Sequence, residues 1–182
     1  MKIVWKVIML CIYVTLILAT HIFIVNFLPY PFNHINIIFV ILLLLLIVAP
    51  NKKIFWLGLV ISYFSELLSS IPFGIGTSAL LASLLTINWF QLHILTNRSV
   101  YMILLSATLG ITLYRILFIL LLTIYNYFYN LPGLPYKEIL ADTGWEVLLS
   151  SILLFLMYLF DLKFLKYLHS SARNARMYGK NI

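Results

Sequence analysis

The sequence is poor in charge and has almost no cysteine. Only 9% of its 182 residues are charged, whereas a soluble domain is about 25% charged, so the composition excludes an ordinary soluble domain. The single cysteine, Cys11, lies inside an apolar run and has no second thiol in the chain with which to form a disulfide. No low-complexity linker divides the chain, and residues 1–182 are expected to form one domain.

Apolar residues make up 64% of the chain and are gathered into six runs. The runs cover residues 3–27, 35–49, 54–70, 77–95, 99–125 and 147–168. They predict an all-α polytopic protein with six transmembrane helices. The first run is too long for a signal-peptide core and is expected to remain as a helix. The second is almost pure Ile, Leu and Val, and we expect it to face lipid on several sides.

Basic residues fall almost entirely in every second gap between these runs. Ten lie on one side of the predicted bilayer, namely Lys2, Lys6, Lys52, Lys53, Arg98, Lys163, Lys166, Arg173, Arg176 and Lys180. Only Lys137 lies on the other side. This asymmetry predicts a protein of the inner, cytoplasmic membrane with both termini in the cytoplasm. Because the charges are scattered over the ends of the runs and form no single basic face, we expect lipid and not nucleic acid as their partner.

The longest outer segment, residues 130–146, holds three of the five acidic residues of the chain. These are Glu138, Asp142 and Glu146. A short interfacial helix that begins near Pro135 and an irregular loop are equally compatible with its composition.

Two ionisable residues lie within predicted spans, and both share a helix face with small or hydroxyl residues. Glu66 is flanked by Ser62 and Ser69, and Arg115 by Thr108 and Thr112. A rise of about 1.5 Å per residue places both charges in the outer half of the bilayer. They predict either a site for a ligand or partner, or a structural ion pair of Glu66 with Arg115, formed directly or through water.

No arrangement typical of catalysis is found. The surroundings of Ser78 lack the nucleophile-elbow pattern, the four histidines have no metal-ligand spacing, and no glycine-rich phosphate loop is present. We therefore expect neither an enzyme nor a bound cofactor or metal.

The segment 55–80 carries a recognisable pattern: a helix with Gly58, an acid at Glu66, a turn with Pro72 and Gly74, and then a helix of small residues. This pattern resembles the central signature of the bacterial rod shape-determining protein MreD family. The family usually has Asp where Glu66 stands and a second Gly where Ser62 stands. The number of spans and the basic tail are also similar to the family.

The resemblance implies a non-enzymatic scaffold of the machinery that elongates the cell and builds peptidoglycan. Its partners would be an MreC-like single-span membrane protein, peptidoglycan synthases and MreB filaments. The resemblance also implies a fold similar to that of the substrate-binding subunits of energy-coupling-factor transporters. An alternative function is therefore binding of a small, vitamin-type solute in a membrane transporter, and Glu66, Arg115, Thr108 and Thr112 could serve either role.

Overall fold

The computed structural model describes residues 2–48, 51–69, 72–94, 100–130 and 135–178. Side chains are described for fewer residues, and those from 161 onward are not among them. Of the basic residues that define the predicted charge asymmetry, Arg98 and Lys180 lie outside the described residues, and the side chains of Lys2, Lys6 and the four between 163 and 176 are not described.

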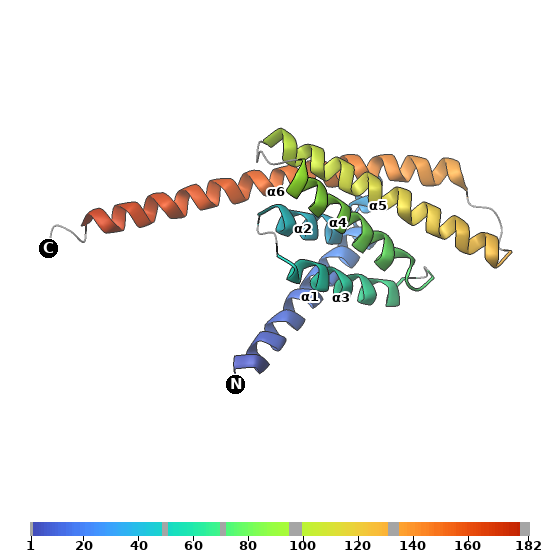
Figure 1. The fold of residues 1–182 in the computed structure, drawn as a ribbon, viewed down its shortest axis with the longest axis horizontal. Coiled ribbons are helices and arrows are strands. Elements are labelled where there is room, and N and C mark those ends of the chain that lie inside the picture. The colour runs from blue at the N-terminus through green and yellow to red at the C-terminus, as the bar shows by residue number, and fades with distance from the viewer. Residues whose placement is uncertain (1, 49–50, 70–71, 95–99, 131–134, 179–182) are drawn as a thin grey trace.

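The described residues form six α-helices and one short 3-10 helix, and they contain no strand (Figure 1). The elements are α1 (Lys2–Phe27), η1 (Phe32–His34), α2 (Ile37–Val48), α3 (Lys53–Leu67), α4 (Ile75–His93), α5 (Val100–Phe128) and α6 (Tyr136–Tyr178). The all-α prediction is confirmed. The first five helices begin and end within three residues of the predicted runs.

The predicted start of the sixth transmembrane helix is wrong. We expected the last span to begin at Val147, but α6 begins at Tyr136, directly after Pro135, and continues to Tyr178. Residues 136–146 are thus helical, and no loop separates them from the following span. Proline is favoured just before or within the first turn of a helix, which explains where α6 starts. The early start brings Glu146 into the body of a helix.

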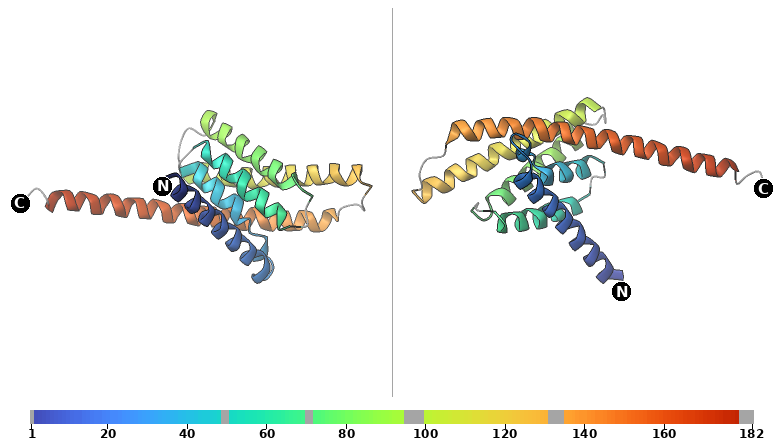
Figure 2. Two further views of the ribbon diagram at one scale, coloured as in Figure 1. Left: turned by 90° about the horizontal axis from the view of Figure 1, so that it is seen from below. Right: turned by 180° about the vertical axis from the view of Figure 1, so that it is seen from behind.

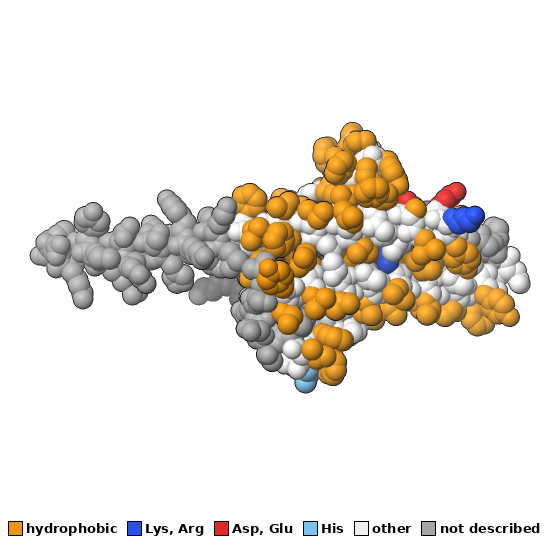
Figure 3. All heavy atoms as spheres, turned by 90° about the horizontal axis from the view of Figure 1, so that it is seen from above, with side chains coloured by type: hydrophobic (Ala, Val, Ile, Leu, Met, Phe, Trp, Pro, Cys, Tyr) orange, Lys and Arg blue, Asp and Glu red, His pale blue; other side chains and the backbone are white. Residues whose placement is uncertain are grey.

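Within the described residues, three helical segments are long and apolar enough to cross a membrane: Ile75–His93, Tyr101–Phe128 and Tyr136–Phe160. Cys11–Phe27 and Ile37–Val48 are shorter apolar helical segments. Hydrophobic side chains cover much of the face shown in Figure 3. An apolar surface of this extent is typical of contact with lipid, so the helices and the surface both fit a membrane protein.

Helix α2 lies at the centre of the bundle. Its side chains Phe39, Val40, Leu42, Leu43 and Leu46 have no exposed surface, and α2 contacts each of the other five α-helices. The expectation that this segment faces lipid on several sides is wrong. Lipid tails and a membrane-protein interior are equally apolar, so a continuous Ile/Leu/Val run suits either environment.

Two glycines allow neighbouring helices to approach the centre. A Cβ atom added to Gly58 of α3 would lie 3.4 Å from Leu80 and Leu84 of α4, an ordinary contact distance. At Gly110 of α5, the added atom would lie 3.2 Å from Ile87 Cγ1 and 3.4 Å from Phe39 Cε1. The packing at Gly110 is thus the tighter of the two.

We expect Gly110→Val to lower the unfolding free energy by about 1–3 kcal/mol, because the added methyl groups would overlap a packed core. Thermal unfolding of the purified protein in detergent measures this effect. Gly144→Val is the matched control, since a Cβ at that helical position would meet no heavy atom within 4 Å apart from the adjacent residues and the backbone of its own helix. Equal melting temperatures for the two variants would contradict the described packing around Gly110.

The two terminal helices extend away from the bundle. The C-terminal part of α6 projects from the remaining helices in every view of Figures 1 and 2, and the N-terminal part of α1 projects in Figure 1 and in the right-hand view of Figure 2. Among the described side chains of α1, only Val14 and Ile17 are buried, whereas Trp5, Ile8 and Ile12 are exposed. Most of the apolar surface of α1 is therefore left to lipid or to another chain.

Candidate functional site

The Glu66 carboxylate closes the turn between α3 and α4. Its side chain is buried, and its Oε1 atom accepts the Thr77 backbone N–H at 2.7 Å. The Oε2 atom accepts the Gly74 backbone N–H at 3.0 Å and the Thr77 hydroxyl at 2.9 Å. The first N–H groups of a helix have no partner within the helix, and the helix dipole favours a negative charge at that end. Glu66 therefore caps α4 from the preceding helix.

The sequence around Gly74 makes this cap possible. Gly74 is the N-cap residue of α4 and has a φ of +93°, a left-handed conformation that glycine adopts without a steric penalty. Because glycine carries no side chain, it cannot itself cap the helix, and the carboxylate of Glu66 takes that role. A Cβ atom on Gly76 would lie only 3.0 Å from Glu66 Oε1. Gly76 thus leaves room for the acid of the same signature, whereas Gly74 provides the left-handed conformation of the turn.

Arg115 does not form the ion pair that was expected with Glu66. Arg115 of α5 forms its ion pair with Glu146 of α6 through Nη2 and Oε2, while Glu66 is occupied by the start of α4. The guanidinium carbon of Arg115 also lies 5.8 Å from the centre of the Phe118 ring. The prediction of a direct pair is wrong because Glu146 was assigned to an outer loop, whereas the longer α6 carries it into the bundle.

Asn36 extends the Arg115–Glu146 pair to a third element. Its Nδ2 atom donates to Glu146 Oε1 at 3.0 Å, and its backbone N–H donates to Ser150 Oγ at 3.1 Å. Its Oδ1 atom accepts the Phe39 N–H at 3.1 Å and so caps the first turn of α2. Glu146 is only 1% exposed. These contacts tie the start of α2 to α5 and α6 by charge-assisted hydrogen bonds.

Sequence reasoning missed Asn36, Glu146 and Ser150 as members of this network. One signal was available: Glu146 and Ser150 are four residues apart and would share a face if the helix that starts near Pro135 continued without a break. Asn36 carried no such signal, because its partners are more than 100 positions away in the sequence.

The remaining predicted residues fall into two groups. Ser62 is buried close to Glu66, and the Ser69 hydroxyl donates to the Glu66 backbone carbonyl at 3.1 Å. In α5, the Thr108 hydroxyl bonds the carbonyls of Leu104 and Leu105 within its own helix, and Thr112 is partly buried. Ser62, Glu66 and Ser69 are thus brought together.

A cavity with both polar and apolar lining residues lies beside Glu66. It has a volume of about 270 Å³, and its polar lining includes His21, Asn36, Ser62, Ser65, Glu66 and Tyr114. These residues come from α1, the start of α2, α3 and α5, and Gly76 and Leu80 of α4 complete the lining, so the cavity lies where five segments meet.

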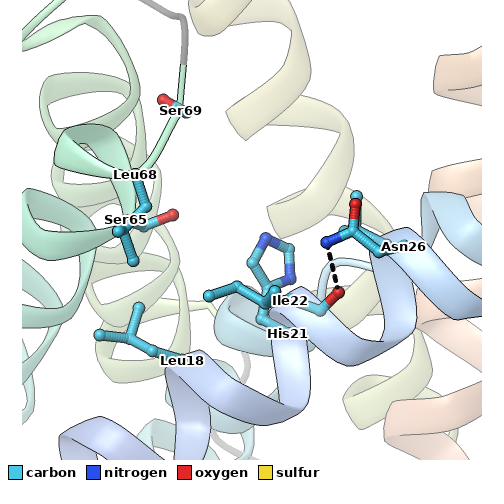
Figure 4. Close-up of a pocket in the computed structure, with 8 residues that line it drawn as sticks. Leu18, His21, Ile22, Asn26, Ser65, Leu68 and Ser69 are labelled. Atoms are coloured by element: carbon cyan, nitrogen blue, oxygen red, sulfur yellow. Dashed lines mark hydrogen bonds between the residues drawn. The ribbon is translucent and has the colours of Figure 1, made fainter.

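A second cavity of about 470 Å³ lies between α1 and the C-terminal end of α3 (Figure 4). His21, Val25, Ser65 and Ser69 line both cavities, so the two adjoin. Leu18, Ile22 and Leu68 add apolar side chains to the second cavity. In Figure 4, Leu18 and His21 of α1 lie across a gap from Ser65 and Leu68 of α3. This arrangement can hold a small molecule or the end of a lipid.

Within the described ranges, no group of three or more His, Cys, Asp or Glu side chains is placed to hold a metal ion. When the chain is compared with models of protein families, with curated proteins and with solved structures, no match is found. Function is therefore argued from the residues themselves.

Proposed function

We propose that the chain is a scaffold of the cell-elongation machinery, as its resemblance to the MreD family implies. One observation carries the proposal: the residues of the signature work as a single structural unit, in which Glu66 caps α4 across the turn that contains Pro72 and Gly74. Arg115 and Glu146 likewise neutralise each other inside the bundle. Buried charges used in this way stabilise an arrangement of helices, which is what a scaffold requires.

The proposed architecture has six spans with both termini in the cytoplasm of a bacterial cell. The charge asymmetry of the sequence supports this orientation. Helices α2 and α3 have 12 and 15 residues, shorter than the roughly 20 residues needed for a full crossing. In this arrangement, the chain on either side of α2 and α3 completes their crossings, as buried or interfacial backbone can.

We expect cysteine labelling in intact cells to reveal this topology. After Cys11→Ala, a membrane-impermeant maleimide should label Glu138→Cys from outside but should leave Lys52→Cys unlabelled until the membrane is permeabilised. Both positions are exposed at the surface of the protein, so accessibility depends on the side of the membrane. The reverse labelling pattern would contradict the proposed orientation.

The proposed direct partner is an MreC-like single-span membrane protein. Through this partner, the scaffold would couple MreB filaments to peptidoglycan synthases. The exposed apolar side chains of α1 support a helix partner, because membrane helices associate by packing such surfaces together. A stable fold and a fixed position of α1 would both be needed for this contact.

Depletion of the protein from its rod-shaped host is expected to give rounded or widened cells, and affinity capture of the tagged full chain should recover the single-span partner. Wild-type protein supplied in trans should restore the rod shape, and so should Glu138→Ala, an exposed change on α6. Unchanged cell shape together with failure to capture a single-span partner would contradict the scaffold function.

The polar cavities favour a second candidate function, a small-solute binding subunit of a transporter. A subunit of this kind needs an internal pocket lined by a few polar groups, as the cavity beside Glu66 is. Loss of uptake of a vitamin-type solute in depleted cells that keep their rod shape would favour this candidate over the scaffold.

A further inference from the structure

We propose that the joined cavities between α1 and α3 bind a primary ammonium group, and that the favoured source is the headgroup of an ethanolamine lipid. The inference rests on the cavity alone and is independent of the scaffold function. Its evidence is the chemical character of the polar atoms, the aromatic ring beside them and the apolar side chains at the outer cavity.

The polar lining is rich in hydrogen-bond acceptors. Glu66 Oε1 receives one hydrogen bond, whereas a carboxylate oxygen can accept two, so one acceptor position remains. The Nδ1 atom of His21 is buried without a hydrogen-bond partner among the described residues. Ser62 and Ser65, which carry hydroxyl groups, line the same cavity from α3. An ammonium group, with three N–H donors, complements these acceptors.

The charge of the site selects a cation. Glu66 is the acid among the described lining residues, and neither cavity has a Lys or Arg among them. The backbone N–H groups of Gly74 and Thr77 donate hydrogen bonds to this carboxylate. Tyr114 also lines the inner cavity, and aromatic rings attract ammonium groups.

The apolar side chains of the outer cavity favour a lipid as the source of that group. Ile22 and Leu68 line it and are 40% and 67% exposed. Figure 4 shows both beside the polar residues His21 and Ser65. A lipid could place its ammonium group near His21 and Glu66 while its acyl chains remain against these exposed apolar side chains.

Native mass spectrometry of the purified full chain tests the proposal with phosphatidylethanolamine and phosphatidylcholine of identical acyl chains. The choline headgroup has no N–H donor, so the ethanolamine lipid is expected to bind about tenfold more tightly, the effect of one charge-assisted hydrogen bond. His21→Leu and Ser65→Ala should each reduce this preference. Thr20→Val is the control, because Thr20 is exposed and its hydroxyl bonds Leu16 of its own helix.

Free ethanolamine distinguishes the two sources of the ammonium group. If millimolar ethanolamine displaces the lipid, the ligand is a soluble amine and the lipid source is wrong. If the preference for phosphatidylethanolamine persists in the presence of ethanolamine, the lipid is the ligand. Equal retention of the two lipids, or a preference that His21→Leu and Ser65→Ala both leave unchanged, would overturn the inference. Neither result depends on cell shape. The scaffold proposal, which is tested by cell shape and partner capture, can therefore fail without affecting this inference.

Discussion

Glu146→Ala is expected to destabilise the protein by about 3–5 kcal/mol, because it leaves Arg115 inside the bundle without its counter-charge. Glu146 is 1% exposed and also accepts a hydrogen bond from Asn36, so the change removes two partners at once. The melting temperature of the purified protein in detergent should fall accordingly.

Glu138→Ala is the matched control for this prediction. It removes the same type of side chain from the same helix, but at an exposed position, so its effect should stay within about 0.5 kcal/mol. The double variant Arg115→Met/Glu146→Leu should be less damaging than the sum of its single changes, because it leaves no unpaired charge. A fully additive double variant would show that the two side chains do not form the described ion pair.

Glu66→Ala is expected to cost about 3 kcal/mol, since it removes the acceptor of two backbone N–H groups and one hydroxyl at the start of α4. Few alternative partners exist for these donors in a membrane. The expected signs are a lower melting temperature and faster amide hydrogen exchange in the first turn of α4.

Glu66→Gln tests whether the negative charge of the Glu66 side chain, and not only its shape, stabilises the start of α4. The amide keeps one acceptor oxygen and the shape of the residue but loses the charge, so its stability should lie between those of wild type and Glu66→Ala. Glu138→Ala again shows the effect of losing an exposed acid. If Glu66→Ala melts together with wild type, the carboxylate is not the cap of α4.

The positions of the helices could be predicted from hydropathy because the constraint behind them is local. Backbone N–H and C=O groups in lipid must be satisfied within each segment, so every long apolar run is expected to be helical. Proline, glycine and charged residues then mark the ends. A helix start near Pro135 is one of the two predicted alternatives for this segment, but the continuity of that helix with the last span was not predicted, because Glu138, Asp142 and Glu146 make residues 136–146 polar.

The candidate site could be predicted only in part. Glu66 was identified correctly as a buried residue, since a charge within an apolar run must face protein or water. Its actual partners, Gly74 and Thr77, lie within the signature itself, yet the capping geometry depends on the left-handed conformation of Gly74. The partner of Arg115 could not be identified, because three acids were available and their depths depended on where α6 begins.

The sequence by itself determined the class of this protein: a chain that is 64% apolar and 9% charged must form helices that bury their own backbone hydrogen bonds. It also determined that Glu66 and Arg115 require polar surroundings. Only the tertiary structure decided that α2 is central, that Glu146 neutralises Arg115, and that His21 meets the α3 serines across a cavity. Lipid and protein interiors are similarly apolar, so hydropathy cannot distinguish buried from lipid-facing residues, and contacts between distant segments depend on how the helices pack.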